Sequence, residues 1–299
     1  MGHINVAKDN DGIVTLTMDF DGKVNIMNDA FMMLTPGVLA RLEADAANIR
    51  GVIVTSAKSS FLAGGDLALM SRARPGMEAE IFAHFERLKS YLRRLETLGP
   101  PVVAVVNGAA LGGGYELCLA CHHRIALDRD DAQLGLPEIE FGILPAAGGV
   151  IRLTHRLGFD RALPWLLQGR CVSLRQAVAE GLVEECADTL AEARDRARAW
   201  ILGNSRPVQP FDAPGRTFGA HSLSGADRTA LQRAVERARP PGDHGNLAAT
   251  RIAEVAAQSL YLPWDVISRI ETRCFVELLM SDEAQARIAA FFAPRRAAG

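Results

Sequence analysis

Residues 101–120 read PVVAVVNGAALGGGYELCLA, and this stretch decides the fold. The segment Val102–Val106 is a run of small and β-branched apolar residues, dense enough to form a strand that is covered on both faces. Three glycines at positions 112–114 then lead into an apolar run that we expect to be helical. A buried strand, a glycine turn and a helix predict one unit of an α/β fold.

The sequence before this stretch repeats the alternation of strand and helix. Residues Ile13–Asp19 alternate apolar and polar side chains, and Gly51–Ser56 is a compact Val/Ile run, so both are predicted strands. Before residue 101, apolar residues at spacings of four and three define one face of a long helix. They are Ile81, Phe85, Leu88, Leu92 and Leu95. Together these segments predict an α/β core.

The composition and the residue pattern of the sequence change near residue 190. Residues 189–202 look helical, residues 206–219 are rich in proline and glycine, and the chain beyond Asp227 has a helical pattern. The breaks in that pattern are Pro240, Pro241 and Pro263. We predict a core domain over residues 1–190 and a helical C-terminal region over residues 191–299 that packs on the core.

The composition excludes several classes of partner. With 48% hydrophobic residues, the 299-residue chain can bury a full core, and its net charge of -2 gives no general attraction to nucleic acid or to anionic membranes. Residues 1–12 lack the apolar stretch of a signal peptide, and Asn107 and Glu116 interrupt the most apolar segment. We therefore expect a cytoplasmic protein that binds neither nucleic acid nor membrane.

The five cysteines predict reduced thiols rather than disulfides, because no export signal is evident. Cys118, Cys121 and His122 match the C-x-x-C-H pattern of covalent haem attachment, but the pattern runs through an apolar helix, so we interpret both cysteines as buried and structural. The adjacent His122 and His123 point apart on a helix or a strand, which argues against a metal site.

The candidate functional groups of the chain are two glycine turns and two carboxylates. The helix after residues 112–114 begins with free N–H groups, so its start favours negative charge, and we expect Glu116 one or two residues into this helix. FLAGGDL at residues 61–67 again places paired glycines before a helix, with Asp66 as its N-cap. LGLPEI at residues 134–139 places Glu138 on a Pro-bounded turn among apolar residues, where desolvation raises a carboxyl pKa. Taken alone, each pattern also has an ordinary structural interpretation as a turn or a cap.

Together these patterns resemble the enoyl-CoA hydratase/isomerase, or crotonase, family. The resemblance rests on the order and spacing of AGGD at 63–66, LGGGYEL at 111–117, GLPEI at 135–139 and GILPAAGG at 142–149. It spans most of the chain and implies a crotonase-type ββα spiral core with a helical C-terminal region. More narrowly, RLETLG at 94–99 and ACHHRIA at 120–126 look like the hydratase portion of bacterial multifunctional fatty-acid oxidation proteins.

The resemblance implies a role for each of four residues. The backbone N–H groups of Gly65 and Gly113 fall at the positions that form the family's oxyanion hole for the thioester carbonyl. Glu116 and Glu138 fall at the two glutamates that hydrating members use, whereas isomerase-only relatives commonly keep the second alone. Two such donors stabilise an enolate oxygen, and two carboxylates that share one water can exchange protons with it.

The resemblance also implies an acyl-coenzyme A ligand. The adenine end of CoA falls near Ala63, and Gly64 and Asp66 belong to the same CoA-binding segment. No metal and no cofactor are expected beyond the CoA that the substrate carries. Ala146 and Ala147 stand where many relatives have glycine, so the acyl pocket is expected to be narrower.

These observations predict an enoyl-CoA hydratase, a lyase of fatty-acid β-oxidation that adds water to a trans-2-enoyl-CoA. Three alternatives stay open: a Δ3,Δ2-enoyl-CoA isomerase, a dehydratase-thioesterase that makes unsaturated fatty-acid signals, and a non-catalytic subunit that docks a separate dehydrogenase. A serine hydrolase is disfavoured because no G-x-S-x-G is present.

The resemblance implies a homotrimer or hexamer, or association with a separate dehydrogenase. No strand followed by G-x-G-x-x-G occurs in the sequence, so we expect the chain to form 3-hydroxyacyl-CoA without reducing NAD.

Overall fold

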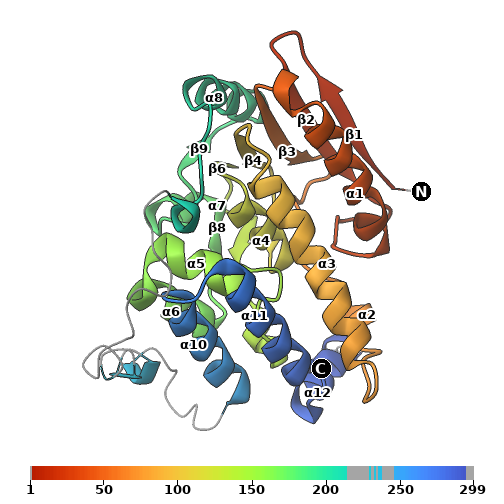
Figure 1. Cartoon of the computed structure of the whole chain (residues 1–299), viewed down its shortest axis with the longest axis vertical. Helices are drawn as coiled ribbons and strands as arrows, with labels where there is room; N and C mark the ends of the chain where they lie inside the picture. Colours follow the sequence, from red (N-terminus) through yellow and green to blue (C-terminus); the bar gives the residue numbers. More distant parts are fainter. Residues whose placement is uncertain (1, 214–228, 230–231, 234, 238–245, 294–299) are drawn as a thin grey trace, which may run out of the picture.

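A six-stranded sheet carries most of the first two-thirds of the chain, in the order β1-β2-β3-β4-β6-β9 (Figure 1). The computed structural model describes residues 2–213, 229, 232–233, 235–237 and 246–293. β1 and β2 are antiparallel, and the other neighbours in the sheet are parallel. The strands are β1 (His3–Lys8), β2 (Ile13–Asp19), β3 (Gly51–Ser56), β4 (Val102–Val106), β6 (His123–Leu127) and β9 (Glu185–Ala187). The three strands predicted from the sequence are confirmed with these bounds.

Helices connect and follow the strands, which confirms the predicted α/β class. They are α1 (Asp29–Ala44), α2 (Leu67–Met70), α3 (Glu78–Glu96), α4 (Gly113–Ala120), α5 (Gly149–Leu157), α6 (Phe159–Gln168), α7 (Leu174–Ala179), α8 (Leu190–Gly203), α10 (Leu247–Ser259), α11 (Trp264–Leu279) and α12 (Asp282–Phe292). Short 3-10 turns are η1 (Ala46–Asn48), η2 (Glu138–Phe141) and η3 (Pro210–Asp212). The long helix predicted from the apolar spacing is α3, and its apolar face is largely buried.

Both faces of the parallel part of the sheet are buried. Val103 and Val105 of β4 face α8 and pack with Ile201, whereas Val102 and Ala104 belong to the main core on the other face. Successive side chains of a strand point to opposite faces, so a strand buried on both sides has to be apolar throughout. The prediction that this strand is covered on both faces is confirmed.

A smaller sheet places two of the candidate segments next to each other. Its strands are β5 (Ala110–Leu111), β7 (Gln133–Gly135) and β8 (Cys171–Ser173). β5 runs parallel to β7, and the N–H of Gly112 donates to the carbonyl of Gly135 at 2.9 Å. Because β5 leads into α4 and β7 leads into η2, the helix that carries Glu116 and the turn that carries Glu138 begin side by side.

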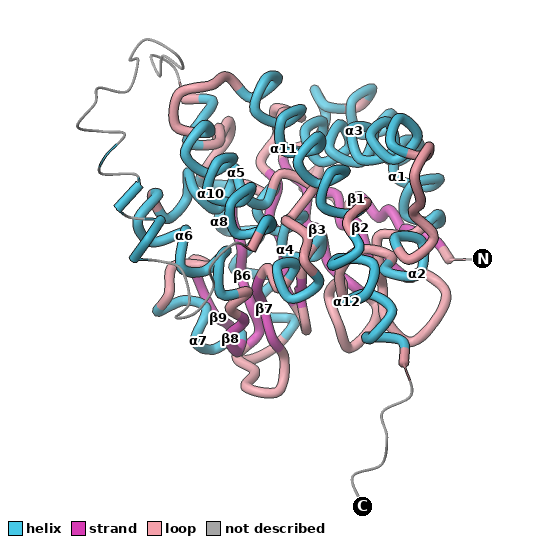
Figure 2. Tube along the Cα trace, turned by 90° about the horizontal axis from the view of Figure 1, so that it is seen from below, coloured by secondary structure: helices cyan, strands magenta, loops and turns pink. Residues whose placement is uncertain are grey.

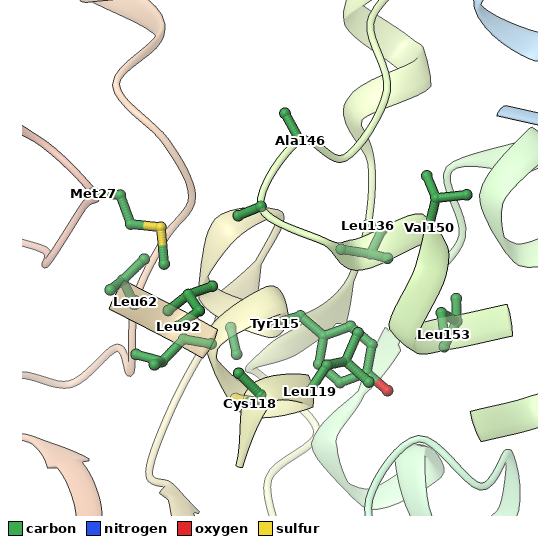
Figure 3. Close-up of a cluster of buried hydrophobic side chains, with 14 of the residues drawn as sticks. Met27, Leu62, Leu92, Tyr115, Cys118, Leu119, Leu136, Ala146, Val150 and Leu153 are labelled. Carbon is green, nitrogen blue, oxygen red and sulfur yellow. The ribbon is translucent and has the colours of Figure 1, made fainter. Parts of the chain in front are cut away.

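Helix α4 lies in the middle of the main core, and all of its residues are buried. Figure 3 shows Tyr115 and Cys118 of α4 between Leu62 on one side and Leu153 on the other. The Tyr115 hydroxyl donates to the carbonyl of Leu182 at 2.9 Å, so its one polar atom is satisfied. Both cysteines of the C-x-x-C-H pattern are buried and free, in agreement with their interpretation as structural residues.

The helices near the C-terminus pack on the first part of the chain. α11 lies beside α3 and α5, and α10 lies beside α5 and α6 (Figures 1 and 2). The predicted break at Pro263 is confirmed, since α10 ends at Ser259 and Pro263 is the N-cap residue of α11, whereas Pro240 and Pro241 lie outside the described residues. The domain boundary at residue 190 stays a prediction. Among the described residues, no helix has both the length and the apolar character to cross a bilayer.

The first testable prediction concerns the close approach of α4 to the segment before it. A Cβ at Gly114 would lie 1.9 Å from the carbonyl oxygen of Leu62, so Gly114→Ala must displace backbone. We expect it to lower the free energy of unfolding by about 1–3 kcal/mol, despite the better helix propensity of alanine. The matched control is Gly37→Ala in α1, where no atom lies within 4 Å of the added Cβ, and which should stabilise by about 0.5–1 kcal/mol. Urea denaturation measures both values, and equal effects would contradict the packing argument.

Candidate active site

An apolar cavity of about 190 Å³ brings the predicted segments together. Glu116 and Glu138 are the two ionisable residues in its lining, and the glycines of both predicted turns, including Gly65 and Gly113, line it as well. The rest of the wall is largely apolar, and part of it comes from Phe275 of α11. Segments that are separated by many residues in sequence therefore meet at one small cavity.

Glu116 is bound to the beginning of another helix. Its Oε1 accepts hydrogen bonds of 2.7 Å from the N–H groups of both Ala147 and Gly149, where α5 begins. A Cβ at Gly149 would lie 2.7 Å from the same oxygen, so this contact requires glycine. The sequence placed Glu116 one or two residues into its helix, and this is wrong. It is the fourth residue of α4, because Gly113 and Gly114 are already helical.

Glu138 follows Pro137 at the start of η2, as the Pro-bounded pattern predicted. It lines the cavity, and its buried Oε2 has no hydrogen-bond partner among the described residues. Gly112 lies directly against this carboxylate, since a Cβ there would be 2.6 Å from Oε1, and its φ of +51° is also in the region that favours glycine. The turn before α4 therefore leaves room for the side chain of Glu138.

Both carboxyl groups have a raised affinity for protons. Burial and then the negative charge of Glu271 raise the pKa of Glu116 to about 8, although the N–H groups of Gly149 and Ala147 act in the opposite direction. Burial and then the charge of Glu116 raise the pKa of Glu138 well above its usual range. Two carboxyl groups in one apolar cavity resist losing both protons, so they titrate as a pair.

The two glycine turns present their backbones to the same cavity. A Cβ at Gly113 would lie 3.6 Å from the backbone nitrogen of Gly65 and 2.8 Å from the sulfur of Met27, so the two turns are in close contact. Gly113 is the first residue of α4, and the N–H of a first residue has no partner within its helix. Gly64 precedes Gly65 with a φ of +99°, a conformation that fits glycine.

The segment predicted to bind CoA divides between two cavities. Ala63 and Gly64 line the cavity of the two glutamates, and the N–H of Ala63 donates to the carbonyl of Asn25 at 2.8 Å. Asp66 instead lines a neighbouring cavity of about 280 Å³. Its side chain accepts a 3.0 Å hydrogen bond from the N–H of Leu69 and caps α2, as the sequence predicted.

The paired histidines lie away from the cavity and point apart. Nδ1 of His122 accepts a hydrogen bond from the N–H of Val102 at 3.0 Å. His123 stacks on Trp200 and approaches Glu185 at 2.8 Å through Nε2. In the part of the chain that the structure describes, no three His, Cys, Asp or Glu residues are grouped to hold a metal ion.

Glu271 was not among the site residues predicted from the sequence. This residue of α11 is fully buried, and its charge acts on both Glu116 and Glu138. The available signal was its helical spacing, since Glu271 is four residues from both Ile267 and Phe275 and so belongs to the buried face of α11.

The chain is similar to several known proteins. Residues 8–207 match the family model described as Enoyl-CoA hydratase/isomerase. An enoyl-CoA hydratase from Bacillus halodurans is 22% identical, with 96% of this chain and 99% of that chain covered and a TM-score of 0.66. A carnitinyl-CoA dehydratase from Mycobacterium thermoresistibile is 19% identical, with coverage of 97% and 89% and a TM-score of 0.71. DspI from Pseudomonas aeruginosa is 27% identical, with coverage of 78% and 93% and a TM-score of 0.61.

The second prediction follows from the raised pKa of Glu116. A carboxyl whose pKa is higher in the folded chain favours folding at low pH, and this contribution is lost as the pH rises from about 4.5 to about 8. Glutamine cannot ionise, so Glu116→Gln has no such contribution to lose. The free energy of unfolding of the variant minus that of the wild type should therefore increase as the pH rises over this range. Urea denaturation between pH 5 and 8 measures the difference. Glu140→Gln, which removes an exposed carboxylate from η2, is the control and should keep the wild-type dependence. If the difference in unfolding free energy between Glu116→Gln and the wild type stayed constant with pH, the pKa of Glu116 would not be raised.

Proposed function

Because the chain belongs to the enoyl-CoA hydratase/isomerase family, we propose that it is an enoyl-CoA hydratase. The reaction is the reversible addition of water to a trans-2-enoyl-CoA, which gives a 3-hydroxyacyl-CoA. The observation that supports hydration is the pair Glu116 and Glu138, two carboxyl groups with raised pKa in one apolar cavity. Adding water requires one group to take a proton and another to give one.

The surroundings of the two carboxyl groups suggest which is the base. Glu116 accepts two backbone hydrogen bonds, and bonds of this kind favour the ionised form. Oε2 of Glu138 has no partner among the described residues, so its surroundings favour the neutral form. In the proposed mechanism, Glu116 removes a proton from water as the oxygen bonds to the β-carbon, and Glu138 delivers its proton to the α-carbon.

The backbone turns are proposed to hold the thioester oxygen. When water adds to the β-carbon, the electron pair of the double bond moves onto the thioester and forms an enolate. Gly65 and Gly113 both line the cavity, and in the proposed mechanism their N–H groups donate to that oxygen. Loss of one such donor typically costs about 3–4 kcal/mol of transition-state stabilisation.

The apolar wall of the cavity suits the acyl chain. Ala146 and Ala147 belong to this wall, and they are the two positions at which many relatives carry glycine. Ala63 and Gly64 are the proposed contacts of the CoA moiety, whereas the capping bond of Asp66 gives that residue a structural role. The proposed reaction needs no metal and no further cofactor. Function in β-oxidation, a cytoplasmic location, and assembly as a homo-oligomer or with a dehydrogenase stay predictions.

Purified protein incubated with crotonyl-CoA and with longer enoyl-CoAs tests the proposal directly. Hydration removes the double bond conjugated to the thioester, so the ultraviolet absorbance of that group should fall. A parallel incubation with a 3-enoyl-CoA measures isomerisation, which would raise the same absorbance before any fall. Isomerisation without hydration of any 2-enoyl-CoA would reject the hydratase assignment.

The third prediction tests the two carboxyl groups. Glu116→Gln and Glu138→Gln should each lower kcat for hydration by about 10²–10⁴-fold, the usual contribution of a positioned acid or base. Binding of a saturated acyl-CoA, measured by calorimetry, should stay within a few-fold of wild type, because neither variant blocks the cavity. Glu140→Gln is again the control. Near wild-type hydration by either cavity variant would show that its assigned role is wrong.

The fourth prediction tests the backbone donor at Gly113. Gly113→Pro removes the N–H, and proline is well tolerated at the first position of a helix, so the fold should survive. Gly113→Ala keeps the N–H, and the one tight contact of its added Cβ is with the flexible Met27 side chain. We expect the proline variant to lose at least about 100-fold in kcat relative to the alanine variant. Equal rates in two folded variants would reject the oxyanion-hole assignment.

A further inference from the structure

Glu271 is a third buried carboxyl group close to the proposed active site. It belongs to α11, beyond the residues matched by the family model, and its side chain is 0% exposed. Neither carboxylate oxygen has a hydrogen-bond partner within normal geometry among the described residues. Burial of a poorly paired carboxylate destabilises a protein by several kcal/mol, so its presence needs a physical explanation.

The surroundings of Glu271 are charged and come from several elements. Lys89 of α3 places Nζ 3.7 Å from the carboxylate and also donates a hydrogen bond to the carbonyl of Ser268. Burial raises the pKa of Glu271 to about 7, and Lys89 and Arg152 act in the opposite direction. The charged and titratable groups that act on it are Lys89 from α3, Arg152 from α5, Glu116 from α4 and Glu138 from η2, and Lys89 also pairs with Glu86 of α3.

Glu116 and Glu271 share the beginning of α5. The N–H groups of Ala147 and Gly149 donate hydrogen bonds to Glu116. Helix α11 packs beside α5, and the backbone N–H groups of Gly148 and Ile151 lower the pKa of Glu271 without forming a hydrogen bond of normal geometry. The helix start therefore offers its positive end to two carboxyl groups from different helices. Each negative charge makes the other harder to form, because both lie in a low-dielectric interior.

Arg152 fixes this arrangement from inside α5. Its Nη1 donates to the carbonyl of Ala147 at 2.7 Å, and its Nε and Nη2 bind Glu96 of α3 at 2.9 and 3.1 Å. With its own partner in Glu96, Arg152 is not a dedicated counter-ion of Glu271. Lys89 is the cation that faces Glu271 directly.

We propose that Glu271 is a positioning residue whose ionised carboxylate, held by Lys89, keeps Glu116 a strong base for the attack of water. The inference rests on the proposed function. The N–H groups at the start of α5 stabilise the ionised form of Glu116, and a second negative charge nearby offsets part of that stabilisation. The pKa of Glu116 is therefore higher, and Glu116 takes a proton from water more readily. Glu271 does not line the cavity and so acts through Glu116 rather than on the substrate.

The test compares pH profiles of hydration for Glu271→Gln, Glu271→Asp and wild type. In Glu271→Gln, the acidic limb of kcat should move to lower pH by about one unit, the low end of the effect of a neighbouring charge. The plateau should fall by about three- to tenfold, because a weaker base is a poorer catalyst, while KM stays within twofold. Glu271→Asp keeps the charge and should recover most of both changes. The control is Glu277→Gln on the same helix as Glu271, which removes a carboxylate that pairs with Arg251 of α10 and should leave the profile unchanged.

Lys89→Met is a second variant, and the direction in which it should move the acidic limb of kcat is specific to the proposal. Without Lys89, Glu271 should remain protonated to higher pH, so the acidic limb should again move to lower pH. A direct effect of Lys89 on Glu116 has the opposite sign, because loss of a positive charge raises the pKa of a nearby carboxyl. A shift to higher pH would therefore overturn the proposal even if Glu271→Gln failed to fold.

Carbon-13 NMR titration of the glutamate carboxyl groups provides a measurement that does not depend on activity, with Glu116→Gln used to assign the signal of Glu116. The apparent pKa of Glu116 should fall in Glu271→Gln. That fall in a protein that hydrates no enoyl-CoA would support the positioning role while rejecting the proposed function. Wild-type hydration with an unchanged limb and an unchanged titration in Glu271→Gln would leave the hydratase standing and overturn the role of Glu271.

Discussion

Two hydrogen bonds from the start of α5 to the carboxylate of Glu116 determine how the rest of the site is built. They require α4 and α5 to approach so closely that Gly149 has no room for a Cβ. The peptide at Ala147 is also fixed on its carbonyl side, where the side chain of Arg152 donates a hydrogen bond to the carbonyl of Ala147. Because Arg152 is itself bound to Glu96, the contact ties α3, α4 and α5 into one buried network.

Local signals in the sequence were sufficient to predict the strands β2, β3 and β4, the long helix α3 and the N-cap of α2. Val102–Val106 is buried on both faces and so had to be continuously apolar, and Asp66 caps its helix with its own side chain. The position of Glu116 was mistaken because glycine propensity argues against a helical start at Gly113 and Gly114. Tertiary packing overrides that preference, since α4 contacts the backbone of Leu62 where only glycine fits.

The long-range parts of the site could not be predicted from local patterns. The closeness of Gly112 to Glu138 depends on the pairing of β5 with β7, which are more than 20 residues apart. The position of Glu271 depends on α11 lying beside α3 and α5 (Figure 1). Helical spacing places Glu271 on a buried face, but only the packing of α11 reveals which charges it meets. The motifs therefore pointed to the proposed site residues, and the fold supplies their electrostatic surroundings.

Ionisable groups are concentrated in a buried part of the protein, where the ionised form of a side chain is unfavourable. Glu116, Glu138 and Glu271 are acidic groups in a largely apolar interior, and every pair among them is repulsive. If these positions served stability alone, apolar side chains of similar volume could replace the three groups, and such a replacement is often neutral or stabilising. The backbone N–H groups of α5 and the side chain of Lys89 offset part of the repulsion without neutralising it. What remains is a raised pKa for all three carboxyl groups, and groups of this kind can exchange protons in the hydration proposed above.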